Sequence, residues 1–197
     1  MIHKNSELLR KLIHLSNLII PFTYLFYFNT RIEALIVLVP ITLFSLLIEY
    51  LRINSSIVKN IFDSYLFTML RNHEISGKYT GATWVFIAST LSIAVFPKEI
   101  AVLSLVFMSI GDTTAGIIGR KFGRIKFYNK TFEGALAGLI VCLIIGLMMD
   151  LNLPNVIIIV GAFSAMIIEL IPVSLDDNLR IPLFSGTIMY AMSIVLI

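Results

Sequence analysis

Apolar stretches of 16 or more residues with almost no charge recur seven times in this chain of 197 residues. Each of them must leave water, and a helix of about 20 apolar residues is long enough to cross a bilayer. Several of the stretches are shorter than this, so the pattern predicts seven membrane spans but leaves six or eight open. The stretches cover residues 12–28, 32–51, 81–96, 100–118, 134–149, 156–171 and 181–197.

The composition also indicates a membrane protein. Hydrophobic residues make up 58% of the chain and charged residues 14%, whereas about 25% of a soluble protein is charged. We therefore predict an all-α fold, a polytopic membrane bundle of about seven transmembrane helices that forms a single domain over residues 1–197. No small-residue cleavage site follows the first span, which indicates a retained helix and not a signal peptide.

The basic residues indicate the orientation, because loops rich in lysine and arginine stay in the cytoplasm. With the amino terminus inside, only Arg31 and Lys98 of the 15 basic residues fall in outer loops. The pattern therefore predicts a cytoplasmic amino terminus and an external carboxyl terminus. The long inner loop after the second span has apolar residues at helical spacing from Ile57 to Leu70, which predicts an amphipathic helix on the cytoplasmic side. Packing of this helix on the bundle is an equally good interpretation.

Many of the carboxylates lie where a membrane protein rarely tolerates charge. Asp112 precedes Arg120 by eight residues, so a helix places it about 12 Å from the positive end of its span. An isolated carboxylate at this depth costs several kcal/mol unless a cation, a metal or water meets it. A structural ion pair with a buried lysine or arginine is the alternative to a functional role. Six acids lie in a span or at its cytoplasmic end: Glu49, Asp112, Glu133, Glu169, Asp176 and Asp177.

The residues near Asp112 are of the types that bind a metal ion and a polyphosphate. Mg²⁺ prefers hard oxygen ligands and completes its shell with water and phosphate oxygens. Guanidinium and ammonium groups would neutralise the phosphates, and glycines would let the backbone approach them. Each feature alone is weak, but together with Asp176 and Asp177 they predict a nucleotide site. The basic residues are Arg120, Lys121, Arg124, Lys126 and Lys130, and the glycines are Gly111, Gly116, Gly119 and Gly123.

Other familiar sites are excluded by the sequence. It contains neither a G-x-x-x-x-G-K-[ST] phosphate loop nor a G-x-S-x-G nucleophile motif. The three histidines, His3, His14 and His73, lack the spacing of a metal site. Cys142 is the single cysteine and lies within an apolar stretch, so we expect it to pack in the core.

Several motifs in a fixed order resemble the CTP-dependent lipid kinases, the family of dolichol, phytol and farnesol kinases and the CTP-using diacylglycerol kinase. They are GDTTAGIIGRKFG from Gly111, KTFEGALAG from Lys130, a glutamate in the next span at Glu169, and DDNLRIP from Asp176. ELLRKLIHL from Glu7 and SGKYTGATW before the third span are also similar to this family. The resemblance extends from about residue 7 to residue 186.

The resemblance implies an integral-membrane catalytic domain that transfers the γ-phosphate of CTP to the hydroxyl of a lipid alcohol, of the polyprenol (dolichol) type or a diacylglycerol. The partners that it implies are CTP, Mg²⁺ or another divalent cation, the lipid alcohol and the bilayer, with no nucleic acid, and the oligomeric state is left open. The active site would lie on the cytoplasmic side. The choice of CTP over ATP rests on the resemblance alone.

The expected roles divide between metal, phosphate and proton transfer. Asp112 and Asp177 are assigned to the metal, with Asp176 in support. Either Glu133 or Glu169 would take the proton of the lipid hydroxyl, a contribution of about 10²- to 10⁴-fold in rate. The candidate catalytic residues are Asp112, Lys130, Glu133, Glu169 and Asp177. The candidate cofactor-binding residues are Gly111, Gly116, Gly119, Arg120, Lys121, Gly123, Arg124, Thr131, Asn178, Arg10, Lys11 and His14, the last three with anionic lipid heads as an alternative ligand.

Three other functions are weighed against this one. Phosphatidate cytidylyltransferase shares the G-D-x-x-A element, but its basic and acidic signature is missing after Gly134. The CDP-alcohol phosphotransferases need D-G-x-x-A-R, whereas Asp112 is followed by Thr113. A non-enzymatic transporter with acids at the membrane midplane fits less well, because the polar residues gather at one side.

Overall fold

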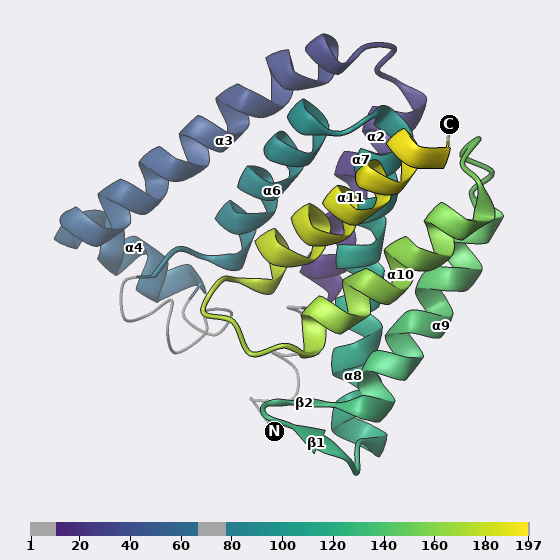
Figure 1. Ribbon diagram of the computed structural model, residues 1–197. Coiled ribbons are helices and arrows are strands. Elements are labelled where there is room, and N and C mark those ends of the chain that lie inside the picture. Colours follow the sequence, from purple (N-terminus) through teal and green to yellow (C-terminus); the bar gives the residue numbers. More distant parts are fainter. Residues whose placement is uncertain (1–10, 67–77, 197) are drawn as a thin grey trace.

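The computed structural model describes residues 11–66 and 78–196, and it shows a bundle of helices with one small β-hairpin (Figure 1). The helical class is therefore confirmed. The hairpin joins β1 (Lys126–Phe127) to β2 (Lys130–Thr131), and the strands pair antiparallel. The sequence did not predict it, because strands of two residues are too short to show an alternating pattern.

Each of the apolar stretches forms a helix with similar bounds. Within the described residues, three helices are long and apolar enough to cross a membrane, namely α3, the continuous helix Lys98–Phe122, and α11, and four more apolar helices have 10–17 residues. A helix of 17 residues is about 26 Å long, less than the roughly 30 Å of a bilayer core. The elements are α2 (Ile19–Phe26, the end of the helix Lys11–Phe26), α3 (Arg31–Asn54), α4 (Ser56–Leu66), α6 (Gly81–Val95), α7 (Lys98–Val106), η1 (Phe107–Gly111), α8 (Asp112–Phe122), α9 (Phe132–Met148), α10 (Asn155–Leu170) and α11 (Asp177–Leu196).

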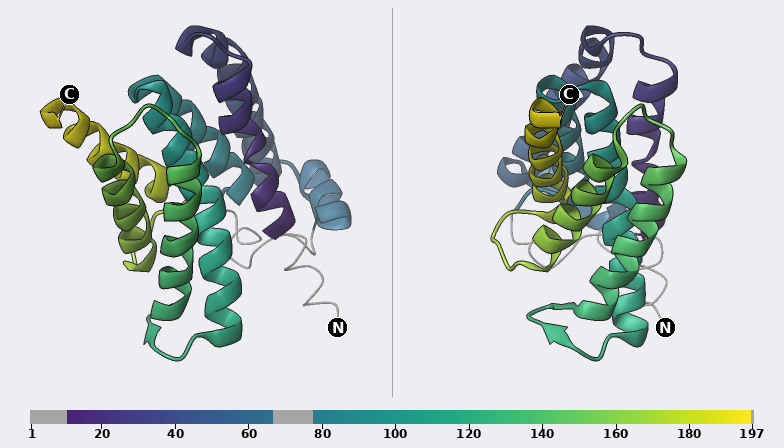
Figure 2. Two further views of the ribbon diagram at one scale, coloured as in Figure 1. Left: turned by 90° about the vertical axis from the view of Figure 1, so that its right-hand side faces the viewer. Right: turned by 45° about the vertical axis from the view of Figure 1, so that its right-hand side comes forward.

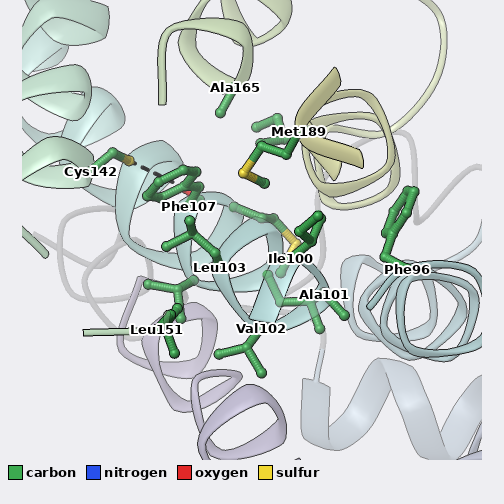
Figure 3. Packing of buried hydrophobic residues seen from close by; sticks show 14 of the residues in the cluster. Phe96, Ile100, Ala101, Val102, Leu103, Phe107, Cys142, Leu151, Ala165 and Met189 are labelled. Carbon is green, nitrogen blue, oxygen red and sulfur yellow. Dashed lines mark hydrogen bonds between the residues drawn. The ribbon is translucent and has the colours of Figure 1, made fainter. Parts of the chain in front are cut away.

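The continuous helix formed by α7, η1 and α8 lies at the centre of the bundle. Every residue from Ile100 to Ser109 is buried, as expected for a helix with neighbours on all sides. Figure 3 shows Phe107 of this helix beside Met189 of α11 and Ala165 of α10. Cys142 of α9 packs here too, with its Sγ 3.8 Å from the main-chain oxygen of Phe107, so its predicted place in the core is confirmed (Figure 3).

Small residues allow α8 and α9 to pack closely. A Cβ atom on Gly134 would lie 2.5 Å from the main-chain oxygen of Ala115, and one on Gly138 would lie 2.9 Å from that of Gly111. Any larger side chain would push the two helices apart, as in the small-residue contacts that are common between membrane helices. This contact holds the start of α8 and the hairpin in a defined relation to α9 and α10.

The polar connections gather at one end of the bundle. The start of the first described helix, the hairpin and the connection from α10 to α11 all lie at this end, while α11 finishes at the other (Figures 1 and 2). The helix predicted in the long loop is present as α4, although Met69 and Leu70 lie outside the described residues. Its residues Ile57 and Ile61 are 72% and 53% exposed, so they face away from the bundle. Its place at a membrane surface stays a prediction.

Candidate active site

A cavity of about 890 Å³ opens at the polar end of the bundle. Its size lies within the range typical of small-molecule sites. One part of its wall is charged and the other is apolar. The charged and amide residues are Lys11, His14, Asn17, Glu49, Asp112, Arg120, Asn129, Lys130, Glu169, Asp177 and Asn178, and the large apolar residues are Ile13, Ile41, Phe44, Ile48, Phe62, Val85 and Phe86.

Lys130 stands at the centre of the charged part. Its Nζ lies 2.6 Å from Glu169 Oε1, 2.8 Å from Asp177 Oδ2 and 3.5 Å from Asp112 Oδ1. Burial of this ammonium lowers its pKa, but the charges of Asp112, Asp177 and Glu169 raise the pKa by more, so that it lies above its usual value. Lys130 is therefore a fixed positive charge among three carboxylates that come from α8, α10 and α11.

Asp112 is positioned by a local change in helix geometry. The five residues of η1, Phe107–Gly111, form a π-helical turn directly before it. Such a turn adds a residue to the helix and is frequently found at functional sites. The side chain of Asp112 is 12% exposed and faces the cavity.

The amino-terminal helix brings two more cationic or titratable groups to Asp112. Lys11 Nζ lies 3.4 Å from Asp112 Oδ2 and 3.3 Å from the Asp112 main-chain oxygen. His14 Nε2 lies 3.6 Å from the same Oδ2 and 3.4 Å from the main-chain oxygen of Met108. The structure thus joins Lys11 and His14 to the predicted site, whereas Arg10 lies outside the described residues.

The contacts of Asp112 with Lys11, His14 and Lys130 are longer than a direct charge-assisted hydrogen bond, which measures about 2.7–2.9 Å. Asp112 does have basic partners, as the alternative of a structural ion pair requires. However, its distances to Lys11, His14 and Lys130 all lie between 3.4 and 3.6 Å. The carboxylate therefore lies within reach of all three of these groups.

Glu169 is the most unusual carboxylate of the cavity. Its side chain is 2% exposed, and only Oε1 bonds to Lys130. The other oxygen, Oε2, is buried without a hydrogen-bond partner among the described residues. A buried polar atom left unpaired costs about 1–3 kcal/mol, and such a cost is typical of a group reserved for a ligand or a reaction.

Arg180 orders the acids on α10 and α11 and was not among the predicted site residues. Its Nε donates a hydrogen bond of 2.7 Å to Asp177 Oδ1, and its Nη2 donates to the main-chain oxygen of Glu169 at 3.1 Å. Arg180 also donates to the main-chain oxygen of Ile171. The sequence signal was its place three residues after Asp177, which puts both side chains on one helix face.

Glu49 of α3 forms a second charged group, which the sequence flagged as a buried acid but did not assign to the site. Its Oε2 accepts from Arg52 at 2.8 Å, and its Oε1 accepts from the main-chain N–H of Thr80 at 2.8 Å. The hydroxyl of Thr80 also donates to Oε1, at 2.5 Å, and the hydroxyl of Thr83 lies within donating distance of it, at 3.1 Å. Both oxygens of Glu49 are therefore well supplied with donors, and they fasten the start of α6 to α3.

The remaining predicted residues divide into two groups. Gly116, Gly119, Arg120, Thr131 and Asn178 line the cavity, where the Thr131 hydroxyl also caps α9 by accepting from the N–H of Gly134 at 3.2 Å.

The second group lies outside the cavity wall. Glu133 accepts from the main-chain N–H of Ile125 at 3.0 Å and lines a separate surface pocket with Lys121, Gly123 and Arg124. Asp176 caps α11 through an acceptor contact with the N–H of Asn178 at 3.0 Å. Gly111 packs among helices: a Cβ there would lie 2.5 Å from Met166 Cε. Roles for these residues in binding metal or phosphate stay predictions.

The donor chemistry of the cavity suits a divalent cation. Among residues 11–66 and 78–196, no group of three or more His, Cys, Asp and Glu side chains is arranged to hold a metal ion by itself. Mg²⁺, however, usually takes one or two carboxylates and keeps water or phosphate oxygens as its other ligands. Asp112, Glu169 and Asp177 all present oxygens to Lys130, and the Oε2 atom of Glu169 has no partner in the described part of the chain.

The fold and the cavity define a helical membrane protein with a charged site at one end of its bundle, and comparison with known proteins narrows this class. The CTP-dependent diacylglycerol kinase 1 of Schizosaccharomyces pombe is 27% identical over 160 residues, which cover 72% of this chain and 73% of that protein. A probable chloroplastic phytol kinase 1 of Glycine max is 32% identical over 126 residues, 52% of this chain and 40% of that protein. An uncharacterized protein of Rickettsia prowazekii is 26% identical over 182 residues, 88% of each chain.

No family model matches the chain, and the comparison with solved structures gives no match. The similar proteins that carry a functional name are diacylglycerol or phytol kinases, the kind of enzyme that the sequence motifs resemble. The chain is therefore similar to the CTP-dependent lipid kinases, and the predicted resemblance is confirmed.

Proposed function

We propose that this protein transfers the γ-phosphate of CTP to the hydroxyl of a lipid alcohol at the cytoplasmic face of a membrane, with the help of a divalent cation. One observation carries the proposal: the same cavity holds the three carboxylates around Lys130 and an apolar wall from α3 and α6. A kinase for lipids needs this combination, because one substrate is a polyanion and the other is largely hydrocarbon.

The charged part of the cavity would bind the triphosphate. Lys130 and Arg120 line it, and Lys11 reaches it from the amino-terminal helix. Phosphoryl transfer asks little covalent chemistry of the protein, so positioning and neutralisation of charge supply most of the rate. Asp112 and Asp177 are the residues that would hold the divalent cation, whose contribution would be to neutralise charge on the phosphate oxygens.

Glu169 is the better of the two candidates for the general base. It lies in the cavity with its Oε2 unpaired among the described residues, whereas Glu133 lines a different pocket and bonds to a main-chain N–H. In the proposed reaction Glu169 takes the proton of the lipid hydroxyl while the alcohol oxygen bonds to the γ-phosphorus. The bond from that phosphorus to the bridging oxygen breaks, and CDP leaves.

The membrane arrangement forms part of the proposal. Seven helices would cross the bilayer as one domain over residues 1–197, with the shorter ones spanning a locally thin region. The odd number of crossings agrees with a polar end and a carboxyl-terminal end on opposite sides of the bundle (Figure 1). The concentration of basic residues at the polar end supports its cytoplasmic location.

The decisive experiment follows two labels from CTP. Purified protein in detergent is incubated with Mg²⁺ and a panel consisting of dioleoylglycerol, phytol and a polyprenol. Label from γ-labelled CTP is expected in the lipid fraction, and label from α-labelled CTP is not. Entry of the α-label into lipid with release of pyrophosphate would show a cytidylyltransferase, and no transfer to any of the alcohols would contradict the proposal.

A further inference from the structure

The apolar part of the cavity contains a pair of hydroxyl groups for which phosphate binding has no use. Ser45 of α3 and Thr83 of α6 both line the cavity, and their oxygens lie 2.7 Å apart. Their neighbours in the cavity wall include Phe44, Ile48 and Phe86. Neutral hydrogen-bonding groups in an apolar wall suit a ligand that is mostly hydrocarbon but carries a neutral polar group.

The proton of Ser45 becomes available to such a ligand in one of the two hydrogen-bond arrangements that the Ser45–Thr83 pair allows. Thr83 can direct its own proton either to Ser45 Oγ or to Glu49 Oε1, which lies 3.1 Å away. Glu49 loses little in the first arrangement, because its Oε1 also accepts from the N–H and the hydroxyl of Thr80 at 2.8 and 2.5 Å. With Thr83 donating to Ser45, the Ser45 hydroxyl is free to donate into the cavity.

A second hydroxyl pair between the same helices provides a comparison. Thr42 of α3 and Thr90 of α6 have oxygens that are also 2.7 Å apart, yet neither residue lines the cavity. Thr42 donates to the main-chain oxygen of Leu38 and is 7% exposed. This pair serves helix packing only, as polar contacts between membrane helices commonly do. The difference between the two pairs is access to the cavity.

We propose that Ser45, supported by Thr83, donates a hydrogen bond to an ester carbonyl of the acceptor lipid, which makes the acceptor a glycerolipid with acyl esters. The inference rests on the proposed function, since it concerns the lipid of the same cavity. A polyprenol or phytol carries its single hydroxyl at the reacting end and has no second polar group for the apolar wall. A diacylglycerol carries ester carbonyls between its hydroxyl and its chains, and a carbonyl is an acceptor that a hydroxyl donor satisfies.

The test compares two lipids that differ only in these carbonyls. They are 1,2-dioleoylglycerol and its diether counterpart, which has the same chains and the same free hydroxyl. For each lipid, KM is measured with saturating CTP, and the shift of the melting temperature of the detergent-solubilised protein is measured with lipid alone. One neutral hydrogen bond corresponds to about a 2- to 10-fold preference for the ester lipid in the wild-type protein.

The variants assign this preference to a residue. Ser45→Ala is expected to remove the ester preference, Ser45→Thr to retain it, and the packing control Thr42→Val to leave it unchanged. The inference is wrong if the wild-type protein treats both glycerolipids alike, if Ser45→Ala keeps the preference, or if Thr42→Val abolishes it equally.

The two readouts separate this inference from the proposed function. Phosphorylation of phytol or polyprenol without phosphorylation or binding of either glycerolipid would overturn the inference while the kinase proposal survives. An ester-selective melting shift with no phosphoryl transfer to any lipid would support the Ser45 contact and contradict the kinase proposal. Absence of a melting shift with both glycerolipids would contradict the inference.

Discussion

Glu49 and Glu169 line the same cavity and are both almost fully buried, yet their surroundings differ. Glu49 is 1% exposed and Glu169 is 2% exposed. The carboxylate of Glu49 is paired with Arg52 and accepts hydrogen bonds from both the main-chain N–H and the hydroxyl of Thr80. The carboxylate of Glu169 uses one oxygen for Lys130 and leaves the other unpaired among the described residues. Burial alone therefore does not show which acid acts on a substrate.

The difference shows how a buried acid that stabilises the fold can be told from one that acts on a substrate. A buried charge whose donors all come from the protein is complete before any ligand arrives, and its loss should act on folding. A buried charge with an unused oxygen is complete only when a ligand or a proton arrives, and its loss should act on turnover. Four substitutions test this distinction, from the largest expected effect to the smallest.

Glu169→Gln should reduce turnover by about 10²- to 10⁴-fold, the range for removal of a general base. The glutamine amide would keep the size of the side chain but could not take a proton. The measurement is turnover at saturating CTP, Mg²⁺ and lipid, together with the melting temperature in detergent. A variant with near-normal turnover would remove Glu169 from the mechanism and make it resemble Glu49.

Asp112→Asn should reduce turnover by about 10²- to 10³-fold, because an electrostatic contact at the transferring phosphate is lost. Asparagine keeps the size of the side chain that faces Lys11 and Lys130 at 3.4 and 3.5 Å, so we expect the loss to fall mainly on turnover and less on the melting temperature. Asp177→Asn is the matched comparison on α11. Normal turnover with a clear loss of stability in the Asp112 variant would identify a structural ion pair.

Glu49→Gln should destabilise the protein by about 3–5 kcal/mol, since it breaks the buried ion pair between Glu49 and Arg52. The measure is the free energy of unfolding in detergent, or the melting temperature where unfolding is irreversible. Turnover per folded molecule should stay within a few-fold of the wild type. A loss of turnover as large as that of Glu169→Gln, with unchanged stability, would end the distinction between the two acids.

Glu133→Gln should change turnover by less than about 3-fold, the smallest of the four effects. Its side chain is half-buried, lies outside the cavity wall and bonds to the main-chain N–H of Ile125, and a side chain in such a place contributes little to stability or to catalysis. The same turnover assay serves as the measurement. A loss of 10²-fold or more would restore Glu133 as the candidate base and place the reaction near the surface pocket.

Much of the site could be predicted from the sequence because rare residue types carry it. Asp112 and Glu169 stand out as carboxylates within apolar stretches, and Lys130 follows a basic run. The helix positions followed from the same apolar stretches, since every one of them must be removed from water. The hairpin that presents Lys130 could not be predicted, because its two strands are too short for a pattern.

Other features depended on distances between segments far apart in the chain. Lys11 and Asp112 are 101 positions apart and lie 3.4 Å from each other through Nζ and Oδ2. Ser45 is an ordinary small polar residue of an apolar helix, and nothing in its local sequence shows that its hydroxyl lies 2.7 Å from that of Thr83.

The sequence by itself determined that this protein lies in a membrane, where its helices are and which residue types form its site. The reason is that the free energy of moving apolar and charged groups between water and lipid is a property of each segment alone. Only the tertiary structure decided which buried acid is satisfied and which is not. Hydrogen bonding depends on donors within about 3 Å, and those donors come from other helices. The packing of α3 on α6 supplies them to Glu49, while the meeting of α10 with the hairpin leaves Glu169 Oε2 without one among the described residues.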